Sequence, residues 1–144
     1  MTYRFTAQLA CGLDDPDQDD CVIAGVAESD DEGAFSLLFM CDFNEPDAQE
    51  VRLGMDTHCL VTPDQGTAYG CVREVELNGE LLRVTLDPSS LDALGLTDPV
   101  VEVSLRVPAA DVARMREVLS RILAYGRPDA RPRLIQPWLS AAAE

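Results

Sequence analysis

The sequence predicts an α+β fold: a mainly antiparallel, curved β-sheet of about six to seven strands, with one long C-terminal helix packed on one face. Three observations lead to this prediction. Short runs of alternating apolar and polar residues recur along residues 2–107, separated by segments rich in Asp, Gly and Pro. Asn78-Gly79, between two such runs, is a strong hairpin signal. Residues 109–125 form the only long segment with a helical spacing of apolar residues.

The first part of the chain predicts three strands separated by acidic turns. Residues 2–13 alternate well enough for a strand, and residues 14–20 (DDPDQDD) are expected to form a solvated loop. Residues 21–27 are apolar on both faces, which predicts a central strand or one that lies under another layer. A second acidic turn at residues 28–33 joins them to a hairpin partner at residues 34–43. Residues 44–53 are polar, with one helical turn expected.

The middle of the chain predicts a three-stranded meander over residues 56–87. A strand at residues 54–62 and a tight turn at residues 63–66 lead into the hairpin. A type I′ turn at Asn78-Gly79 requires a register in which Leu77 faces Glu80, Val75 faces Leu82, Arg73 faces Val84 and Cys71 faces Leu86. One face of the hairpin is then apolar except for Arg73, and Glu74 lies opposite Arg83 on the wet face.

The last part of the chain predicts a short helix, a strand, the long helix and an arm. Residues 88–95 are expected to form a short helix closed by Gly95, and residues 100–107 alternate as a strand. The long helix, residues 109–125, follows Pro108 and is ended by Gly126 and Pro128. Residues 127–144 cannot continue it, and the apolar Trp138 predicts an extended arm docked on this molecule or on a neighbour.

Length and charge limit the domain organisation and the partners. The chain has 144 residues, which predicts a single domain, residues 1–144, with residues 127–144 as the arm. Its formal net charge is −15, from 26 acidic and 11 basic residues. Such a field repels nucleic acid and anionic membrane, so we expect neither as a partner, and it favours a basic protein. Five cysteines without a disulfide pattern, and no signal-peptide or membrane-spanning pattern, favour a cytoplasmic location.

No catalytic motif is visible, so the sequence predicts a protein that is not an enzyme and that needs no cofactor and no metal. Asp15, Asp17 and Asp19 match the first three ligand positions of an EF-hand loop, but the Gly and Glu that should follow are missing. His58 and Cys59 are adjacent in a predicted strand and point to opposite faces, so they cannot pair as base and nucleophile. We interpret them as a structural histidine and a buried thiol.

The two acidic turns are the strongest functional candidates. Their carboxylates are those of Asp14, Asp15, Asp17, Asp19 and Asp20 in the first acidic turn, and of Glu28, Asp30, Asp31 and Glu32 in the second acidic turn. An acidic surface can guide a basic partner rapidly into contact. Solvated turns that serve only solubility are the competing interpretation, on even terms.

Three longer segments resemble those of a known family. They are RLGMDTHCLVTPDQGTAYGCV at residues 52–72, LDPSSLDALGL at residues 86–96, and VARMREVLSRILAYGRPDARP at residues 112–132. Together with the TYRFTA start, they resemble the immunity protein 10 family of bacterial polymorphic toxin systems. The resemblance implies an α+β cytosolic protein that binds and neutralises a cognate toxin domain. Such a toxin is usually encoded nearby and often acts as a nuclease, and the family brings no catalytic residues.

The combined interpretation is an immunity protein that neutralises its toxin through an acidic surface. Many toxins that cut nucleic acid are basic around the active site, so an inhibitor rich in Asp and Glu imitates the charge of phosphate. Two alternatives remain. One is a protein for a small molecule, either an enzyme that uses Cys59 or His58 in a concave pocket or a binding module without catalysis. The other is a homodimeric interaction module in which the arm that carries Trp138 is exchanged between subunits.

Overall fold

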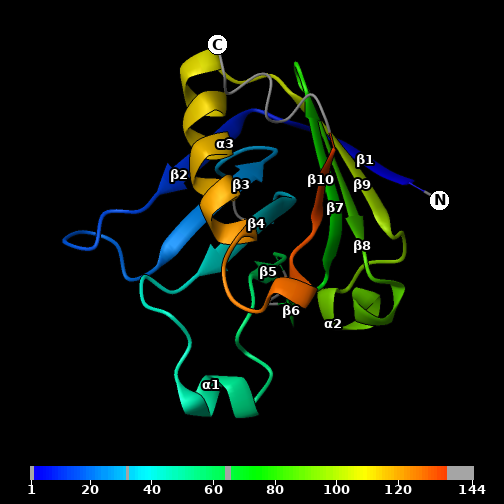
Figure 1. The fold of residues 1–144 in the computed structure, drawn as a ribbon. Helices are drawn as coiled ribbons and strands as arrows, with labels where there is room; N and C mark the ends of the chain where they lie inside the picture. The colour runs from blue at the N-terminus through cyan, green and yellow to red at the C-terminus, as the bar shows by residue number, and fades with distance from the viewer. Residues whose placement is uncertain (1, 32, 64–65, 136–144) are drawn as a thin grey trace.

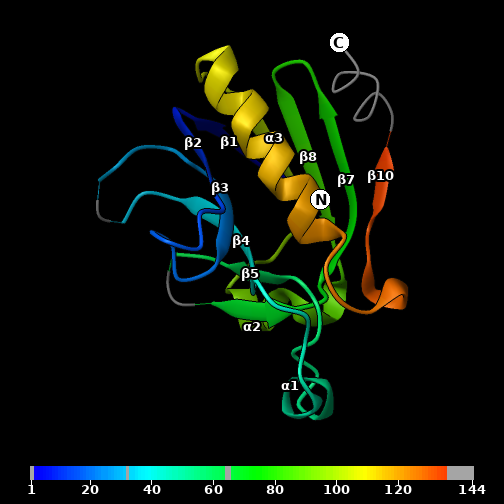
Figure 2. The same ribbon diagram turned by 60° about the vertical axis from the view of Figure 1, so that its left-hand side comes forward.

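Two five-stranded sheets with one long helix between them make up the molecule (Figures 1 and 2), in a computed structural model that describes residues 2–31, 33–63 and 66–135. Sheet A contains, in spatial order, β1 (Thr2–Ala7), β9 (Val100–Leu105), β8 (Leu81–Leu86), β7 (Val72–Asn78) and β10 (Arg133–Ile135). Sheet B contains β2 (Leu9–Leu13), β3 (Val22–Ala27), β4 (Ser36–Cys41), β5 (Cys59–Val61) and β6 (Thr67–Tyr69). The helices are α1 (Ala48–Arg52), α2 (Leu91–Leu94) and α3 (Ala109–Leu123), with 3-10 turns at Pro88–Ser90 and Pro128–Ala130. The α+β class and the long C-terminal helix are confirmed.

The strands pair mainly in the antiparallel sense, as predicted. All neighbours in sheet B are antiparallel, and β8 is antiparallel to both β7 and β9. The edge strands of sheet A differ, because β1 is parallel to β9 and β10 is parallel to β7. Only Gln8 separates β1 from β2, so the chain passes directly from sheet A to sheet B there. The strand predicted at residues 2–13 is therefore two strands in two sheets.

A second crossing between the sheets shows that the predicted meander over residues 56–87 is wrong. Strands β5 and β6 pair in sheet B, whereas β7 and β8 pair in sheet A. Gly70 lies between β6 and β7 with φ of 63°. Its N–H donates a hydrogen bond of 3.0 Å to the carbonyl oxygen of His58. A left-handed residue cannot continue an extended path, so the chain turns out of sheet B at this glycine.

The hairpin of β7 and β8 forms where it was predicted, but with a different turn. Its two-residue loop is Gly79-Glu80, and Asn78 belongs to β7, where it pairs with Leu81. Gly79 has φ of 62°. Glycine at the first central position of a two-residue loop is typical of a type II′ turn rather than the predicted type I′ turn.

This turn shifts the register of the hairpin by two residues. The observed pairs include Leu77 with Leu82, Glu76 with Arg83, Val75 with Val84 and Glu74 with Thr85. The predicted pairs are therefore wrong: Leu77 with Glu80, Val75 with Leu82, Arg73 with Val84, Cys71 with Leu86 and Glu74 with Arg83. Side chains alternate with a period of two, so this shift leaves the side chains from Glu74 onward on their predicted faces.

A β-bulge removes the one charge that the sequence placed on the apolar face of the hairpin. The register changes between Val72 and Glu74, and Arg73 between them is exposed. Its Nη2 lies 2.5 Å from Oδ2 of Asp87. Cys71 and Val72, the two residues directly before Arg73, are fully buried. The extra residue thus lets the arginine point outward without breaking the pairing farther along the strands.

The core consists of the inner faces of both sheets and the apolar side of α3. In β7, β8 and β9 the inward side chains are almost fully buried: Val75, Leu77, Leu82, Val84, Leu86, Val101, Val103 and Leu105. Helix α3 adds five side chains that are at most 2% exposed: Met115, Val118, Leu119, Ile122 and Leu123. It packs most closely on β2 and β3. Burying one such aliphatic side chain is worth roughly 1.5–3 kcal/mol, so these contacts hold the helix between the sheets.

A close backbone approach attaches the C-terminal end of α3 to the segment that leads into β5. The helix ends at Leu123, two residues before the predicted end, and Gly126 follows with φ of 79°. Gly126 forms a β-bridge with Thr57, and the N–H of Arg127 donates to the carbonyl oxygen of Asp56 at 3.0 Å. A Cβ atom at Gly126 would lie 2.0 Å from that oxygen. Only glycine fits there.

The described part of the predicted arm lies on sheet A. After the 3-10 turn, β10 runs parallel to β7, and Nε of Arg133 lies 3.5 Å from Oε1 of Glu74. Leu134 packs against the core. Residues 136–144, including Trp138, lie outside the described residues, so the docking of Trp138 stays a prediction. The organisation of residues 1–144 as one domain with an arm at residues 127–144 also stays a prediction.

The glycine at the end of α3 gives a first test. We expect Gly126→Ala to lower the free energy of unfolding by about 3 kcal/mol or more, because the added Cβ atom is both in a left-handed conformation and in contact with a carbonyl oxygen. Gly95→Ala is the matched control, since Gly95 has φ of 69° and an added Cβ would meet no atom within 4 Å. It should cost about 1 kcal/mol. Urea unfolding followed by circular dichroism measures both, and equal losses would contradict the close approach.

Candidate functional site

The first acidic turn joins β2 to β3 and is ordered by its own carboxylates. Oδ1 of Asp15 accepts a hydrogen bond of 3.0 Å from the N–H of Asp17, and Oδ2 of Asp19 accepts one of 2.9 Å from the N–H of Asp15. The N–H of Asp19 also donates to the carbonyl oxygen of Asp15 at 2.7 Å. Asp15, Asp17 and Asp20 are exposed, and Asp19 is half-buried. The backbone of the turn is therefore ordered, and its exposed carboxylates project from defined positions.

Asp14 differs from the rest of the first acidic turn, because helix α3 neutralises it. Its carboxylate pairs with Nη2 of Arg114, and its Oδ2 lies 3.6 Å from Nη1 of Arg121. The side chain is 26% exposed. This ion pair between partly exposed groups contributes modestly to stability, but it attaches the start of the turn to the helix. Among the predicted site residues that the structure describes, Asp14 is thus the one whose negative charge is most compensated by neighbouring arginines.

The second acidic turn joins β3 to β4. Oε1 of Glu28 accepts a hydrogen bond of 2.8 Å from the N–H of Phe35, so this half-buried carboxylate closes the base of the turn. Oγ of Ser29 accepts from the N–H of Asp31 at 3.1 Å. Asp30 and Asp31 are exposed. Glu32 lies outside the described residues.

The two acidic turns lie at opposite ends of β3, which the sequence did not reveal. A strand of six residues spans about 20 Å, so the turns cannot form one continuous patch. Further carboxylates lie near the first acidic turn instead. The pKa of the Cys21 thiol is raised by burial and by the neighbouring charges of Asp20, Asp42 and Asp19. Asp42, just after β4, is exposed and was missed because it is isolated in the sequence.

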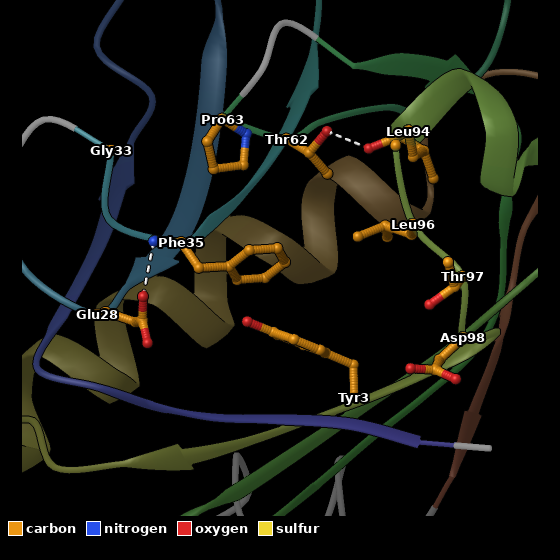
Figure 3. Close-up of a pocket in the computed structure, with 11 residues that line it drawn as sticks. Tyr3, Glu28, Gly33, Phe35, Thr62, Pro63, Leu94, Leu96, Thr97 and Asp98 are labelled. Atoms are coloured by element: carbon orange, nitrogen blue, oxygen red, sulfur yellow. Dashed lines mark hydrogen bonds between the residues drawn. The ribbon is translucent and has the colours of Figure 1, made fainter.

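A cavity of about 380 Å³ opens beside the second acidic turn (Figure 3). The rings of Tyr3 and Phe35 form part of its wall, with their centroids 4.7 Å apart. Glu28 and Asp98 lie on either side of Tyr3. Oδ1 of Asp98 is buried without a hydrogen-bond partner among the described residues. The lining combines aromatic and acidic groups and contains no cysteine or histidine.

A second cavity, of about 240 Å³, brings together three of the five cysteines. Cys21, Cys41 and Cys59 line it together with Tyr69 and Tyr125. Burial raises the pKa of Cys41 to about 11 and also raises the pKa of Cys59. These side chains are therefore protonated thiols at neutral pH, whereas nucleophilic chemistry needs the thiolate.

His58 is fully buried and holds the two sheets together. Its Nε2 accepts a hydrogen bond of 3.1 Å from the N–H of Val72, the first residue of β7, while His58 itself comes directly before β5 of sheet B. Burial, together with the charge of Arg73, lowers the pKa of His58 to about 4. A neutral imidazole that accepts a backbone hydrogen bond has a structural role. Cys59 does not pair with it, as the alternation of the strand predicted.

Neither a metal site nor a membrane span is found in the described parts of the chain. Within residues 2–31, 33–63 and 66–135, no three His, Cys, Asp or Glu side chains are placed to hold a metal ion together. None of the helices in these ranges combines the length and the hydropathy needed to cross a bilayer.

The fold and its surfaces define an acidic α+β protein with ordered, exposed carboxylates on two turns. Residues 6–113 match the family described as Immunity protein 10 (Imm10), so the chain belongs to the immunity protein 10 family, as the sequence predicted. Membership of this family makes it an immunity protein, whose expected partner is a protein toxin. No curated protein and no solved structure matches the chain.

The lowered pKa of His58 predicts a pH dependence of stability. The unfolded state takes up a proton near pH 6.5, while the folded state resists it until about pH 4. The free energy of unfolding should therefore fall as the pH is lowered from 6.5 to 4, by about 3 kcal/mol in total. His58 is the only histidine, so the difference between the protein and His58→Gln in urea unfolding isolates this contribution. Parallel pH profiles of the two proteins would contradict it.

Proposed function

We propose that this immunity protein binds and neutralises a cognate toxin domain through its two acidic turns. One observation supports this most: Asp17, Asp20, Asp30 and Asp31 are exposed and form no ion pair among the described residues, although the turns that carry them are ordered. A turn that is already ordered loses little conformational entropy when a partner binds. These carboxylates are therefore available to a positively charged surface.

The charge of the whole chain supports a basic partner. A net charge of −15 creates a long-range field that repels nucleic acid and attracts cationic proteins. A toxin that acts on nucleic acid needs basic residues to hold phosphates, and carboxylates on the inhibitor can occupy the same residues. Neutralisation then requires only that the toxin surface is covered, so we propose a non-catalytic inhibitor that acts in the cytoplasm.

Co-expression tests this proposal directly. The toxin domain encoded beside this chain should stop the growth of a host cell when expressed alone, and the co-expressed chain should restore growth. The purified pair should form a stable complex by size-exclusion chromatography. A toxic neighbour that the chain neither binds nor neutralises would overturn the proposal.

The acidic turns should act mainly on the rate of association. We expect replacing Asp17, Asp20, Asp30 and Asp31 with Asn to slow association with the toxin domain about ten-fold or more at low ionic strength, because steering by charge is lost. The dependence of the association rate on salt should become weaker. Stopped-flow mixing at several salt concentrations measures both.

A matched variant separates the effect of position from that of net charge. Glu45, Glu80, Asp92 and Asp111 are also exposed and lie outside the two turns. Their replacement with Gln or Asn removes the same charge and should change the association rate much less. Similar effects of the two variants would show that the acidic turns have no special role.

A further inference from the structure

The two sheets differ sharply in the charge of their strands. The strands of sheet B contain no charged residue at all. The strands of sheet A carry charges on the side away from the helix, and these form ion pairs. Nε of Arg4 lies 2.8 Å from Oε1 of Glu102, and Nε of Arg83 lies 3.6 Å from its Oε2. The outer face of sheet A is thus an ordinary solvated surface. The lack of charge on the strands of sheet B is not typical of a surface that contacts only water.

The outer face of sheet B is apolar over most of its area, and its polar residues are Ser36 on β4 and Thr67 and Tyr69 on β6. In β3 the residues that face α3 are buried, while Ile23 and Ala27 on the other side are half-buried. Strand pairing places the outer residues in rows across the sheet: Leu13, Ile23 and Met40 in one row, and Cys11, Gly25, Leu38 and Val61 in the next.

A groove runs across this face. It has a volume of about 320 Å³, and all its lining residues are apolar: Leu9, Ala10, Cys11, Gly25, Val26, Ala27 and Leu38. Leu9 is 46% exposed and Leu13 is 43% exposed. A Cβ atom at Gly25 would lie 2.5 Å from Cδ2 of Leu38, so this glycine leaves room for Leu38 to lie across the sheet. Contiguous exposed apolar surface of this kind typically marks an interaction site.

The acidic turns border this face at both ends, because they are the two connections of β3. Protein interfaces commonly have an apolar centre that is depleted of charge, surrounded by a polar rim. We propose that the outer face of sheet B is the centre of the toxin-binding interface and that the acidic turns are its rim, an inference that rests on the proposed function. The matching toxin surface is apolar in its middle, with Arg or Lys side chains about 20 Å apart on either side.

Charge argues against a second copy of this chain as the occupant. Two copies joined through this face would bring four acidic turns to one interface, and each chain has a net charge of −15. Like charges across an interface cost several kcal/mol, and the strands of sheet B in the partner copy carry no basic residue that would offset them. A partner with basic residues gains from the same carboxylates.

Threonine substitutions on sheet B test the inference with the purified chain and the toxin domain encoded beside it. Leu9→Thr combined with Leu38→Thr removes apolar surface and keeps a residue that favours strands. We expect the dissociation constant to rise roughly ten-fold or more through faster dissociation, with little change in the rate of association. The matched control is Leu81→Thr, because Leu81 is 40% exposed on β8 of sheet A. It should leave the affinity unchanged.

The pattern of outcomes separates this inference from the proposed function. If the unaltered chain binds the toxin and the Leu9→Thr/Leu38→Thr variant binds it equally well, only the role of this face is overturned. If the unaltered chain does not bind the toxin, both the role of this face and the proposed function are overturned. A milder variant, Leu9→Thr/Leu13→Thr, changes two exposed side chains and gives the same test if the first variant does not fold. A dimer of the free chain that the first variant dissociates would instead assign the face to a second copy. If a chain that ends at Ile135 binds the toxin several-fold more tightly, the outer face of sheet B would instead be assigned as the binding site of residues 136–144.

Discussion

Helix α3 has to cover the inner faces of two sheets at once, and the rest of the structure depends on this packing. The helix lies between sheets A and B (Figure 2). Five of its side chains are buried, and its opposite side exposes Arg114, Glu117 and Arg121 to solvent. A helix is only about 10–12 Å wide, so it cannot also reach the outer face of either sheet. The outer faces of the two sheets therefore differ: that of sheet A carries ion pairs, and the strands of sheet B carry no charged residue.

Two close backbone approaches determine where the helix lies, and one of them connects the core to the candidate site. A Cβ atom at Gly126 would lie 2.0 Å from the carbonyl oxygen of Asp56, and one at Gly12 would lie 2.6 Å from that of Arg114. Gly12 comes two residues before Asp14, whose carboxylate pairs with Arg114 and Arg121. The helix that closes the core therefore also orients the first acidic turn. The carboxylate of Asp14 is neutralised in the process, whereas the other carboxylates of the turn form no ion pair among the described residues.

The acidic turns and the apolar face between them supply two different kinds of interaction. Charges act over about a Debye length and bring a basic partner toward the surface. Apolar contacts act only at close range and keep the partner in place once water is excluded. The acidic turns could be predicted from the sequence, because runs of Asp and Glu cannot form a core. Their separation by the length of β3 could not, because it depends on which strands pair.

Local features of the sequence determined the α+β class, the helix that begins at Ala109, the buried face of the β7–β8 hairpin and the solvated acidic turns. These follow from periodicity and turn chemistry, which involve residues close together along the chain. Only the tertiary structure decided the hairpin register, since a shift of two residues preserves every face. It also decided the division into two sheets, which depends on turns at Gln8 and Gly70. Residues 21–27 were recognisably apolar on both faces, but the sequence could not say that α3 covers one face and leaves the other open. That outcome depends on contacts between residues about one hundred positions apart, which no local pattern contains.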